Sequence, residues 1–403
     1  MKSKTETLIE TAERYGAHNY HPLPIVIESG EGAWVTDVEG RRYLDCLSAY
    51  SAVNQGHRHP KIIAALKAQA DRITLTSRAF HNDQMGAFLE QLCVFAGAEM
   101  ALPMNSGAEA VETALKAARK WGYEKKGVAP GEAEIIAVAE NFHGRTISIV
   151  SFSTEEQYRA GFGPFTPGFR IVPFGDLAAL EAAIGPNTVA FLCEPIQGEA
   201  GVLIPPPGYV AAAAALCRKH RVLTIWDEIQ SGLGRTGKRF AYEHDGPEAK
   251  PDLLVLGKAL SGGVYPISAV AGRAEALDVF RPGDHGSTYG GNPLASAVAR
   301  AALAALVDEK MVENSARQGA KLAAGLAAIS SPHVKEIRVR GLWAGIELHE
   351  RAGPARPYCL RLVERGVLAK DTRAQVIRLA PPLIVTESDV EFLLDAVRGV
   401  LGR

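Results

Sequence analysis

Apolar and polar residues follow two different spacings along most of this chain. Between about residues 60 and 300, stretches with helical spacing alternate with short apolar runs that suit buried strands. This alternation predicts an α/β fold in which helices cover both faces of a mostly parallel central sheet. The predicted strands are residues 135–139, 147–152, 188–193, 222–227, 252–256 and 267–271, and the predicted helices are residues 60–71, 82–97, 107–121, 208–220 and 292–306.

The two ends of the chain have different patterns. The elements predicted there are a helix within residues 1–20, a hairpin over residues 34–45, and, after about residue 310, two helices with strands near residues 336–348 and 376–379. Prolines 22 and 24 end the first helical pattern. We therefore expect an N-terminal segment (1–51), a large domain (52–297) and a smaller α+β C-terminal domain (298–403).

Composition narrows the class of protein. The chain has 403 residues, of which 47% are hydrophobic, and its formal net charge of -1 gives no reason to expect a nucleic-acid or membrane partner. Its five cysteines include no CxxC pair, which is typical of a reduced, intracellular protein. No apolar run is long enough to span a bilayer, and the first residues lack a signal-peptide core. We therefore expect a cytoplasmic protein.

Two charged residues lie at the ends of predicted buried strands. Asp227 ends one apolar run, and Lys258 follows another. Burial favours the neutral amine of a lysine, which is the form that bonds an aldehyde. A pyridoxal phosphate enzyme needs such an amine, together with a carboxylate that keeps the ring nitrogen protonated. Because ligands bind beyond the carboxyl ends of parallel strands, we expect Glu194, Asp227 and Lys258 to lie near one site.

Small residues at a helix start suggest a phosphate site. Ser106, Gly107 and Ala108 open a predicted helix, where free backbone N–H groups and the helix dipole favour an anion. The alternative is that Ser106 is only a helix N-cap. Thr288, in a turn rich in glycine, is a second candidate phosphate ligand, although turn chemistry alone also explains that turn.

Two further motifs give weaker signals. Residues 232–237 match the spacing GxGxxG after a strand, but the long helix that a dinucleotide site requires is missing. We interpret them as a flexible loop near the site, with a nicotinamide dehydrogenase as a distant alternative. His57 and His59 have no third ligand at suitable spacing, so we predict no metal site.

Two arginines are candidates for substrate binding. Arg145 lies in a glycine turn, and Arg378 lies inside an apolar strand. A guanidinium is rarely placed in such a run without a carboxylate partner. The alternative is a structural ion pair, but two such arginines suit a dicarboxylic substrate because each can bind one carboxylate through two hydrogen bonds.

Together these motifs resemble the class III, pyridoxal-phosphate-dependent aminotransferases of fold type I over nearly the whole chain. The strongest stretches are residues 16–24, 50–57, 76–80, 141–146, 194–201, 227–230, 256–263 and 286–293. The motifs of Asp227, Lys258 and Thr288 mark the class. Those of Tyr20, Glu199 and Arg378 mark the subgroup that uses ornithine as its amine donor.

The resemblance implies a role for each candidate residue. Lys258 bonds the cofactor and shuttles the proton, and Asp227 pairs with the ring nitrogen. The other implied cofactor contacts are Gln230 at the ring hydroxyl, Phe142 and Ile229 on the ring faces, and Ser106, Gly107, Ala108 and, from the neighbouring subunit of a homodimer, Thr288 at the phosphate. The implied substrate channel is lined by Tyr20, Tyr50 and Arg145.

The implied reaction moves the δ-amino group of ornithine to 2-oxoglutarate, giving glutamate and glutamate 5-semialdehyde, which cyclises to pyrroline-5-carboxylate. Ornithine has one carboxylate and glutamate has two. We therefore hypothesise that Glu199 masks Arg378 while ornithine binds through Arg145 and Tyr20. The alternatives are a class III transaminase that uses acetylornithine, 4-aminobutyrate or lysine, and a catalytically silent binding protein on the same fold.

Overall fold

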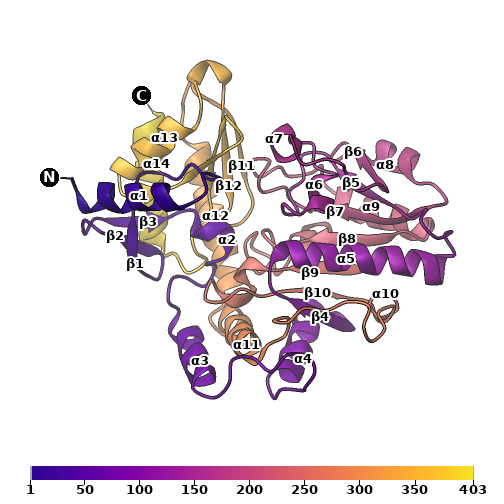
Figure 1. The fold of residues 1–403 in the computed structure, drawn as a ribbon. Coiled ribbons are helices and arrows are strands. Elements are labelled where there is room, and N and C mark those ends of the chain that lie inside the picture. The colour runs from indigo at the N-terminus through magenta and orange to yellow at the C-terminus, as the bar shows by residue number, and fades with distance from the viewer. Residues whose placement is uncertain (1, 403) are drawn as a thin grey trace.

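The computed structural model describes residues 2–402, and a seven-stranded sheet forms the centre of its large domain (Figure 1). The strand order is β4-β10-β9-β8-β7-β5-β6. The strands are β4 (Met100–Met104), β5 (Glu134–Val138), β6 (Phe169–Val172), β7 (Thr188–Cys193), β8 (Leu223–Asp227), β9 (Leu253–Leu256) and β10 (Ser268–Gly272). Strands β5 to β9 run parallel, whereas β10 is antiparallel to both β9 and β4. The predicted α/β fold with a mostly parallel sheet is confirmed.

Alternate residues of the central strands are buried on opposite faces of this sheet. In β5, Ile135 and Ala137 pack in one cluster with helix α5 (Gly107–Trp121), and Ile136 and Val138 pack in another with helix α9 (Tyr209–Lys219). The period of two along a strand therefore explains why both faces need helices, and why the strands are almost entirely apolar.

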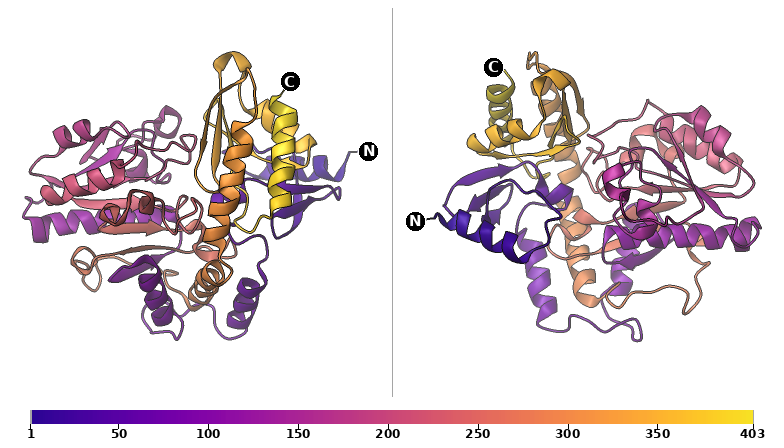
Figure 2. Two further views of the ribbon diagram at one scale, coloured as in Figure 1. Left: turned by 180° about the vertical axis from the view of Figure 1, so that it is seen from behind. Right: turned by 45° about the horizontal axis from the view of Figure 1, so that its top comes forward.

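The N-terminal segment and the C-terminal part of the chain share a sheet. Strand β13 (Val367–Leu368) pairs in parallel with β3 (Arg42–Asp45), so the order of this sheet is β1-β2-β3-β13. Strands β1 (Ile27–Glu31) and β2 (Trp34–Asp37) complete it, and β2 and β3 form the predicted hairpin. In both views of Figure 2 the indigo N-terminal segment lies beside the yellow C-terminal helices.

The small domain has its own four-stranded sheet, which is accompanied by helices α12 (Met311–Ala327), α13 (Arg356–Glu364) and α14 (Glu387–Leu401). The sheet order is β11-β12-β15-β14. Its strands are β11 (Val334–Val339), β12 (Ala344–Leu348), β14 (Lys370–Thr372) and β15 (Val376–Leu379). The prediction of only two helices in this region was wrong, because α13 is short and lies between strands.

The other α-helices are α1 (Lys4–Tyr15), α2 (Ser48–Ser51), α3 (Pro60–Ala70), α4 (Met85–Ala96), α6 (Ile147–Val150), α7 (Glu156–Arg159), α8 (Leu177–Ala183), α10 (Ala274–Leu277) and α11 (Pro293–Asp308). The strand predicted over residues 147–152 was wrong. Thr146 caps a helical turn there by accepting a hydrogen bond from the Ile149 amide. The division at residues 51 and 297 stays a prediction. Among residues 2–402, none of the helices combines the length and apolar composition needed to cross a bilayer.

Candidate active site

An inner cavity of about 210 Å³ lies beyond the carboxyl ends of β7, β8 and β9. It is lined by Gly107, Ala108, Phe142, His143, Gly144, Glu194, Asp227, Ile229, Gln230 and Lys258. Because β7, β8 and β9 are neighbours in the sheet, the residues that follow them meet at one edge. Most of the residues predicted to contact a cofactor therefore line a single cavity.

Asp227 is held in place by two hydrogen bonds. Its Oδ2 lies 2.7 Å from Nδ1 of the buried His143, and its Oδ1 accepts a bond of 3.0 Å from the Ile229 amide. Burial opposes a charge on His143, but the hydrogen bond to the Asp227 carboxylate and its charge raise the pKa of His143. The pair keeps the aspartate oriented toward the cavity, at the point where β8 ends.

Lys258 begins the short 3-10 helix η4 (Lys258–Ser261), directly after β9 and Gly257. Its φ of +44° lies in the left-handed region, which a non-glycine residue adopts at a cost. Desolvation lowers the pKa of Lys258, although the carboxylates of Glu199 and Asp227 oppose the shift. The site therefore favours the neutral amine over the ammonium more than water does.

Glu194 is a second buried carboxyl group at this edge. Its Oε1 accepts a hydrogen bond of 2.9 Å from the Phe142 amide. Burial raises the pKa of Glu194 to about 7, and the charge of Asp227 acts in the same direction. Its bond fixes the backbone of Phe142, whose ring lies on the boundary between the inner cavity and the pocket described below.

The start of α5 forms the far wall of the inner cavity. Ser106 is its N-cap and forms a capping box with Glu109, in which each side chain accepts from the other residue's amide. The N-cap interpretation of Ser106 is therefore confirmed, while its role as a phosphate ligand stays a prediction. A Cβ on Gly107 would lie 3.0 Å from Ile229 Cδ1, and one on Gly144 would lie 2.9 Å from Ala108 Cβ.

These observations test whether pyridoxal phosphate suits the inner cavity. Drug-sized ligands occupy pockets of roughly 300–1,000 Å³, so a cavity of about 210 Å³ suits one substituted ring. It offers an oriented carboxylate at Asp227, an amine of lowered pKa at Lys258, and the start of a helix, where N–H groups are left free for a phosphate. The residues present fit the cofactor.

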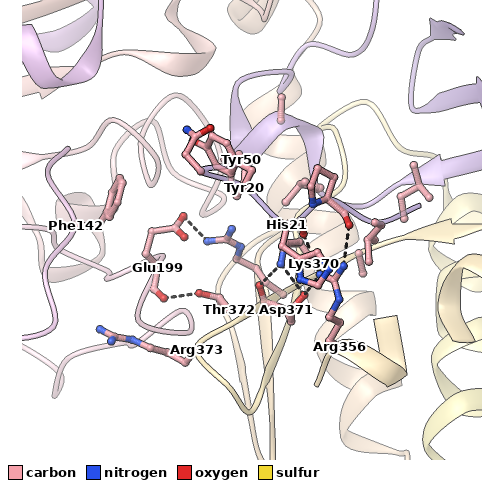
Figure 3. Close-up of a pocket in the computed structure, with 18 of the residues that line it drawn as sticks. Tyr20, His21, Tyr50, Phe142, Glu199, Arg356, Lys370, Asp371, Thr372 and Arg373 are labelled. Atoms are coloured by element: carbon pink, nitrogen blue, oxygen red, sulfur yellow. Dashed lines mark hydrogen bonds and ion pairs between the residues drawn. The ribbon is translucent and has the colours of Figure 1, made fainter. Parts of the chain in front are cut away.

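A larger outer pocket of about 940 Å³ shares Phe142 with the inner cavity (Figure 3). It lies between the large domain, the N-terminal segment and the sheet of the small domain. The predicted substrate residues Tyr20, Tyr50, Arg145, Glu199 and Arg378 all line it. Residues of β14 and the following turn, including Lys370, Asp371 and Thr372, form the wall shown at the centre of Figure 3.

Glu199 and Arg378 form an ion pair in this pocket. Arg378 Nη1 lies 2.6 Å from Glu199 Oε1, and the arginine side chain is only 1% exposed. Burial works against a charge on Glu199, but the charge of Arg378 outweighs it and lowers the pKa of Glu199. Nε and Nη2 of Arg378 have no hydrogen-bond partner among the described residues. The guanidinium therefore keeps two donors for another acceptor.

The backbone of the Glu199 loop is fixed on the small domain. Thr372 donates its hydroxyl to the Glu199 carbonyl, and Arg378 Nη1 donates to the Gly198 carbonyl at 3.3 Å. Arg338 donates from Nε and Nη2 to the Gly201 carbonyl at 3.1 and 3.0 Å. Because the carbonyls are held, the Glu199 side chain can turn away from Arg378 without moving the loop.

Tyr50 reaches the pocket from an unusual turn. All four residues of α2, Ser48 to Ser51, have φ between +47° and +70°, the left-handed region. Each such non-glycine residue costs about 1–2 kcal/mol. The turn is held by Asp45, which accepts from the Ser48 amide at 2.9 Å, and by a 2.7 Å bond from the Ser48 hydroxyl to the Ala380 carbonyl. It places the Tyr50 ring 5.1 Å from Arg378 Cζ.

Arg145 and Tyr20 are the more exposed members of the pocket. Arg145 Cζ lies 3.7 Å from the centroid of the Tyr158 ring, and no described carboxylate forms an ion pair with it. Tyr20 is 75% exposed. Arg145 is thus a cation that rests on an aromatic face and remains available to an anion.

Other predicted positions lie elsewhere. Thr288 is exposed and lines neither cavity in its own chain. Residues 232–237 form a buried turn in which Arg235 donates to the carbonyls of Leu342 and Pro381, so they connect the two domains. His57 Nε2 lies 2.8 Å from Asp45 Oδ2, and His59 Nε2 lies 3.1 Å from Glu309 Oε2.

Sequence reasoning missed His143, Arg338 and Thr372. His143 lies between two predicted site residues, Phe142 and Arg145, but its hydrogen-bond partner Asp227 is 84 positions away in the sequence. Thr372 and Arg338 act on the Glu199 loop from strands 173 and 137 positions distant. Only the tertiary fold reveals these pairings, because no local pattern marks them.

The chain is similar to known aminotransferases in both sequence and structure. A model of the family described as Aminotransferase class-III matches residues 15–401. The chain is 59% identical to the ornithine aminotransferase of Bacillus subtilis over 399 residues, covering 99% of this chain and 98% of that protein. The solved ornithine aminotransferase of Toxoplasma gondii is 46% identical, with a TM-score of 0.97 and coverage of 99% and 95%. The solved acetylornithine aminotransferase of Elizabethkingia anophelis is also 46% identical, with a TM-score of 0.89 and 99% coverage of both chains.

Proposed function

The chain belongs to the class III aminotransferases, and we propose that it moves the δ-amino group of L-ornithine to 2-oxoglutarate. The products are glutamate and glutamate 5-semialdehyde, which cyclises to pyrroline-5-carboxylate. The observation that carries this proposal is the outer pocket, in which Arg378 is paired with Glu199 while Arg145 has no carboxylate partner among residues 2–402. One free cation and one masked cation suit a reaction that alternates between a monocarboxylic and a dicarboxylic substrate.

Pyridoxal phosphate, when bound, supplies the aldehyde that takes up the amino group and the ring that accepts electrons from the broken C–H bond. We propose that Asp227, oriented by His143, holds the proton on the ring nitrogen. The other proposed contacts follow the order around the inner cavity: Phe142 and Ile229 at the ring, Gln230 at the ring hydroxyl, and Ser106, Gly107 and Ala108 at the phosphate.

Lys258 is the proposed base. With pyridoxal phosphate and substrate in the inner cavity, the Lys258 amine would lie beside the carbon that carries the amino group. Desolvation lowers the pKa of this lysine, so the amine is more readily neutral and able to accept the proton from that carbon. The same amine would hold that proton and give it back, so one residue can serve as both base and acid in the proton transfer.

The two arginines determine which amine reacts. Ornithine carries its single carboxylate beside its α-amine, so a carboxylate held at Arg145 and Tyr20 leaves the δ-amine to reach Lys258. Glu199 keeps Arg378 from attracting that carboxylate in the opposite orientation. Glutamate has a second carboxylate, which displaces the Glu199 side chain and uses the two unpartnered donors of Arg378. Its α-amine then reacts.

The test is a panel of amine donors with 2-oxoglutarate. Ornithine should support turnover with trapped pyrroline-5-carboxylate as product, and N-acetylornithine, 4-aminobutyrate and lysine should be poorer donors. N-acetylornithine serves as the sharpest control, since it differs only by capping the α-amine. A preference for N-acetylornithine, or the absence of the cyclic product, would refute ornithine as the substrate.

We further propose that the enzyme is a homodimer in which the neighbouring copy supplies Thr288 to the phosphate. Thr288 is exposed and lines neither cavity of its own chain, which leaves its hydroxyl available to the cofactor of a neighbouring copy. Sedimentation measurements and the cofactor affinity of Thr288→Val test the two parts separately. We also propose a cytoplasmic location, which the five unpaired cysteines support.

A further inference from the structure

The segment that carries Tyr20 has few bonds of its own. Residues 16–26 join α1 to β1 without forming a helix or strand. Pro22 and Pro24 have no backbone N–H and disfavour helix in the residues before them, so this stretch cannot build a regular ladder. A side chain that is 75% exposed, such as Tyr20, cannot position the segment by burial either.

One arginine from the small domain provides the missing attachment. Arg356 Nη1 donates to the His21 carbonyl at 3.1 Å, and Nη2 donates to the Pro22 carbonyl at 2.8 Å. Among the hydrogen bonds of the described residues, these two link residues 19–24 to another part of the chain. Figure 3 shows Arg356 reaching toward His21 on the side of the pocket where Tyr20 lies.

The surroundings of Arg356 argue that it is placed for this contact. It is the first residue of α13, where the helix dipole disfavours a positive charge by roughly 0.3–1 kcal/mol. Its nearest carboxylate, Asp371, lies 3.9 Å from Nη1 and is bound more closely by Lys370, at 2.6 Å. A planar guanidinium offers two donors at fixed spacing, which matches two successive carbonyls better than a lysine does.

We propose that Arg356 is a positioning residue that fixes Tyr20 at the mouth of the outer pocket and thereby favours ornithine over glutamate as donor. This inference rests on the proposed function. Ornithine is anchored only by Arg145 and Tyr20, so loosening Tyr20 removes one of its two anchors. Glutamate retains Arg378 as a further anchor for its second carboxylate, so its binding depends less on Tyr20.

The experiment measures kcat and KM of the holoenzyme for ornithine and, separately, for glutamate in the reverse direction. Arg356→Gln should raise the KM for ornithine about tenfold, equivalent to ~1.4 kcal/mol, with kcat nearly unchanged and glutamate affected much less. Arg351→Gln is the matched control, because it removes a nearby exposed arginine for which no ion pair is found among the described residues. Ornithine turnover by the wild type is established first, which separates failure of this proposal from failure of the proposed function.

Two further variants keep the result specific. In a Tyr20→Phe background, Arg356→Gln should add little to the loss for ornithine, because the arginine acts through that tyrosine. Arg356→Lys should lie between wild type and Arg356→Gln. Limited proteolysis within residues 17–23 should become faster in Arg356→Gln and not in Arg351→Gln. Equal losses for both donors, full additivity with Tyr20→Phe, or unchanged proteolysis would each overturn the proposal.

Discussion

Replacing Glu199 with alanine tests the masking of Arg378 directly. The variant removes the carboxylate that lies 2.6 Å from Arg378 Nη1 and leaves a cation that is 1% exposed at the wall of the outer pocket. Ornithine can then place its carboxylate on Arg378 and present its α-amine to Lys258. Turnover through the δ-amine should fall, and transfer from simple α-amino acids should rise.

The magnitude follows from the donors that become available. In the wild type, Nη1 of Arg378 is engaged by Glu199, while Nε and Nη2 have no hydrogen-bond partner in the part of the chain that the structure describes. Freeing the whole fork gives an incoming carboxylate at least one additional hydrogen bond to a charged group, worth about 1.5–3 kcal/mol. A free-energy difference of ~1.4 kcal/mol corresponds to a factor of ten, so the ratio of α-amine to δ-amine transfer should rise by roughly 10- to 100-fold.

The assay compares kcat/KM for ornithine and for an α-amino donor such as alanine, with pyrroline-5-carboxylate trapped as the δ-transfer product. Glu155→Gln is the control, because Glu155 lines the same pocket and pairs with Arg373, not with Arg378. Thermal unfolding of each variant shows whether the unpaired arginine has weakened the fold. A ratio within twofold of wild type in a folded Glu199→Ala enzyme would refute the masking argument.

Three further predictions concern single residues. Lys258→Ala should retain cofactor and bind ornithine, yet lose about 10²–10⁴ in turnover, because the amine proposed to accept the proton is removed; normal turnover would show that another group accepts it. Burial raises the pKa of Glu228 from 4.5 to about 7, so the native state holds a proton that the unfolded chain releases, and stability falls as pH rises through that window. Glu228→Gln should remove this pH-dependent loss of stability, which amounts to at most ~3 kcal/mol at about 1.36 kcal/mol per pKa unit. The Tm of the variant minus that of the wild type should therefore increase between roughly pH 5 and 8. A difference in Tm that stays constant with pH would contradict this prediction. Arg235→Met should cost about 3 kcal/mol by leaving Asn54 and two carbonyls without a donor, measured by denaturant unfolding with Arg239→Met as an exposed control.

Much of the site follows from where charged residues interrupt apolar runs. Asp227 and Lys258 could be found because charged residues are rare in buried strands and these two follow apolar runs, and the sheet then brings neighbouring strand ends together. The strand predicted at residues 147–152 failed because its alternating pattern also fits one buried helical turn beside Thr146. Strand β6 was missed because Arg170 and Ile171 are exposed on an edge.

The attachments behind the site could not be predicted in the same way. Arg356 bonds a carbonyl 335 positions away, and an arginine that donates to backbone leaves no trace in the pattern of its target. For Ser106 the difficulty is different, because one sequence pattern predicts two roles. Its sequence context predicted both an N-cap and a phosphate ligand, and one residue at a helix start can satisfy either requirement.

The parallel pairing of β3 with β13 has a consequence for synthesis on the ribosome. Leu44 pairs with Val367, which is translated 323 residues later, or about 16–65 s at 5–20 residues per second. Throughout that interval β3 presents an open edge to other nascent chains. Asp45, at the end of β3, also supports the turn that carries Tyr50. The sheet that supports the Tyr50 turn is therefore completed only after nearly the whole polypeptide has been synthesised.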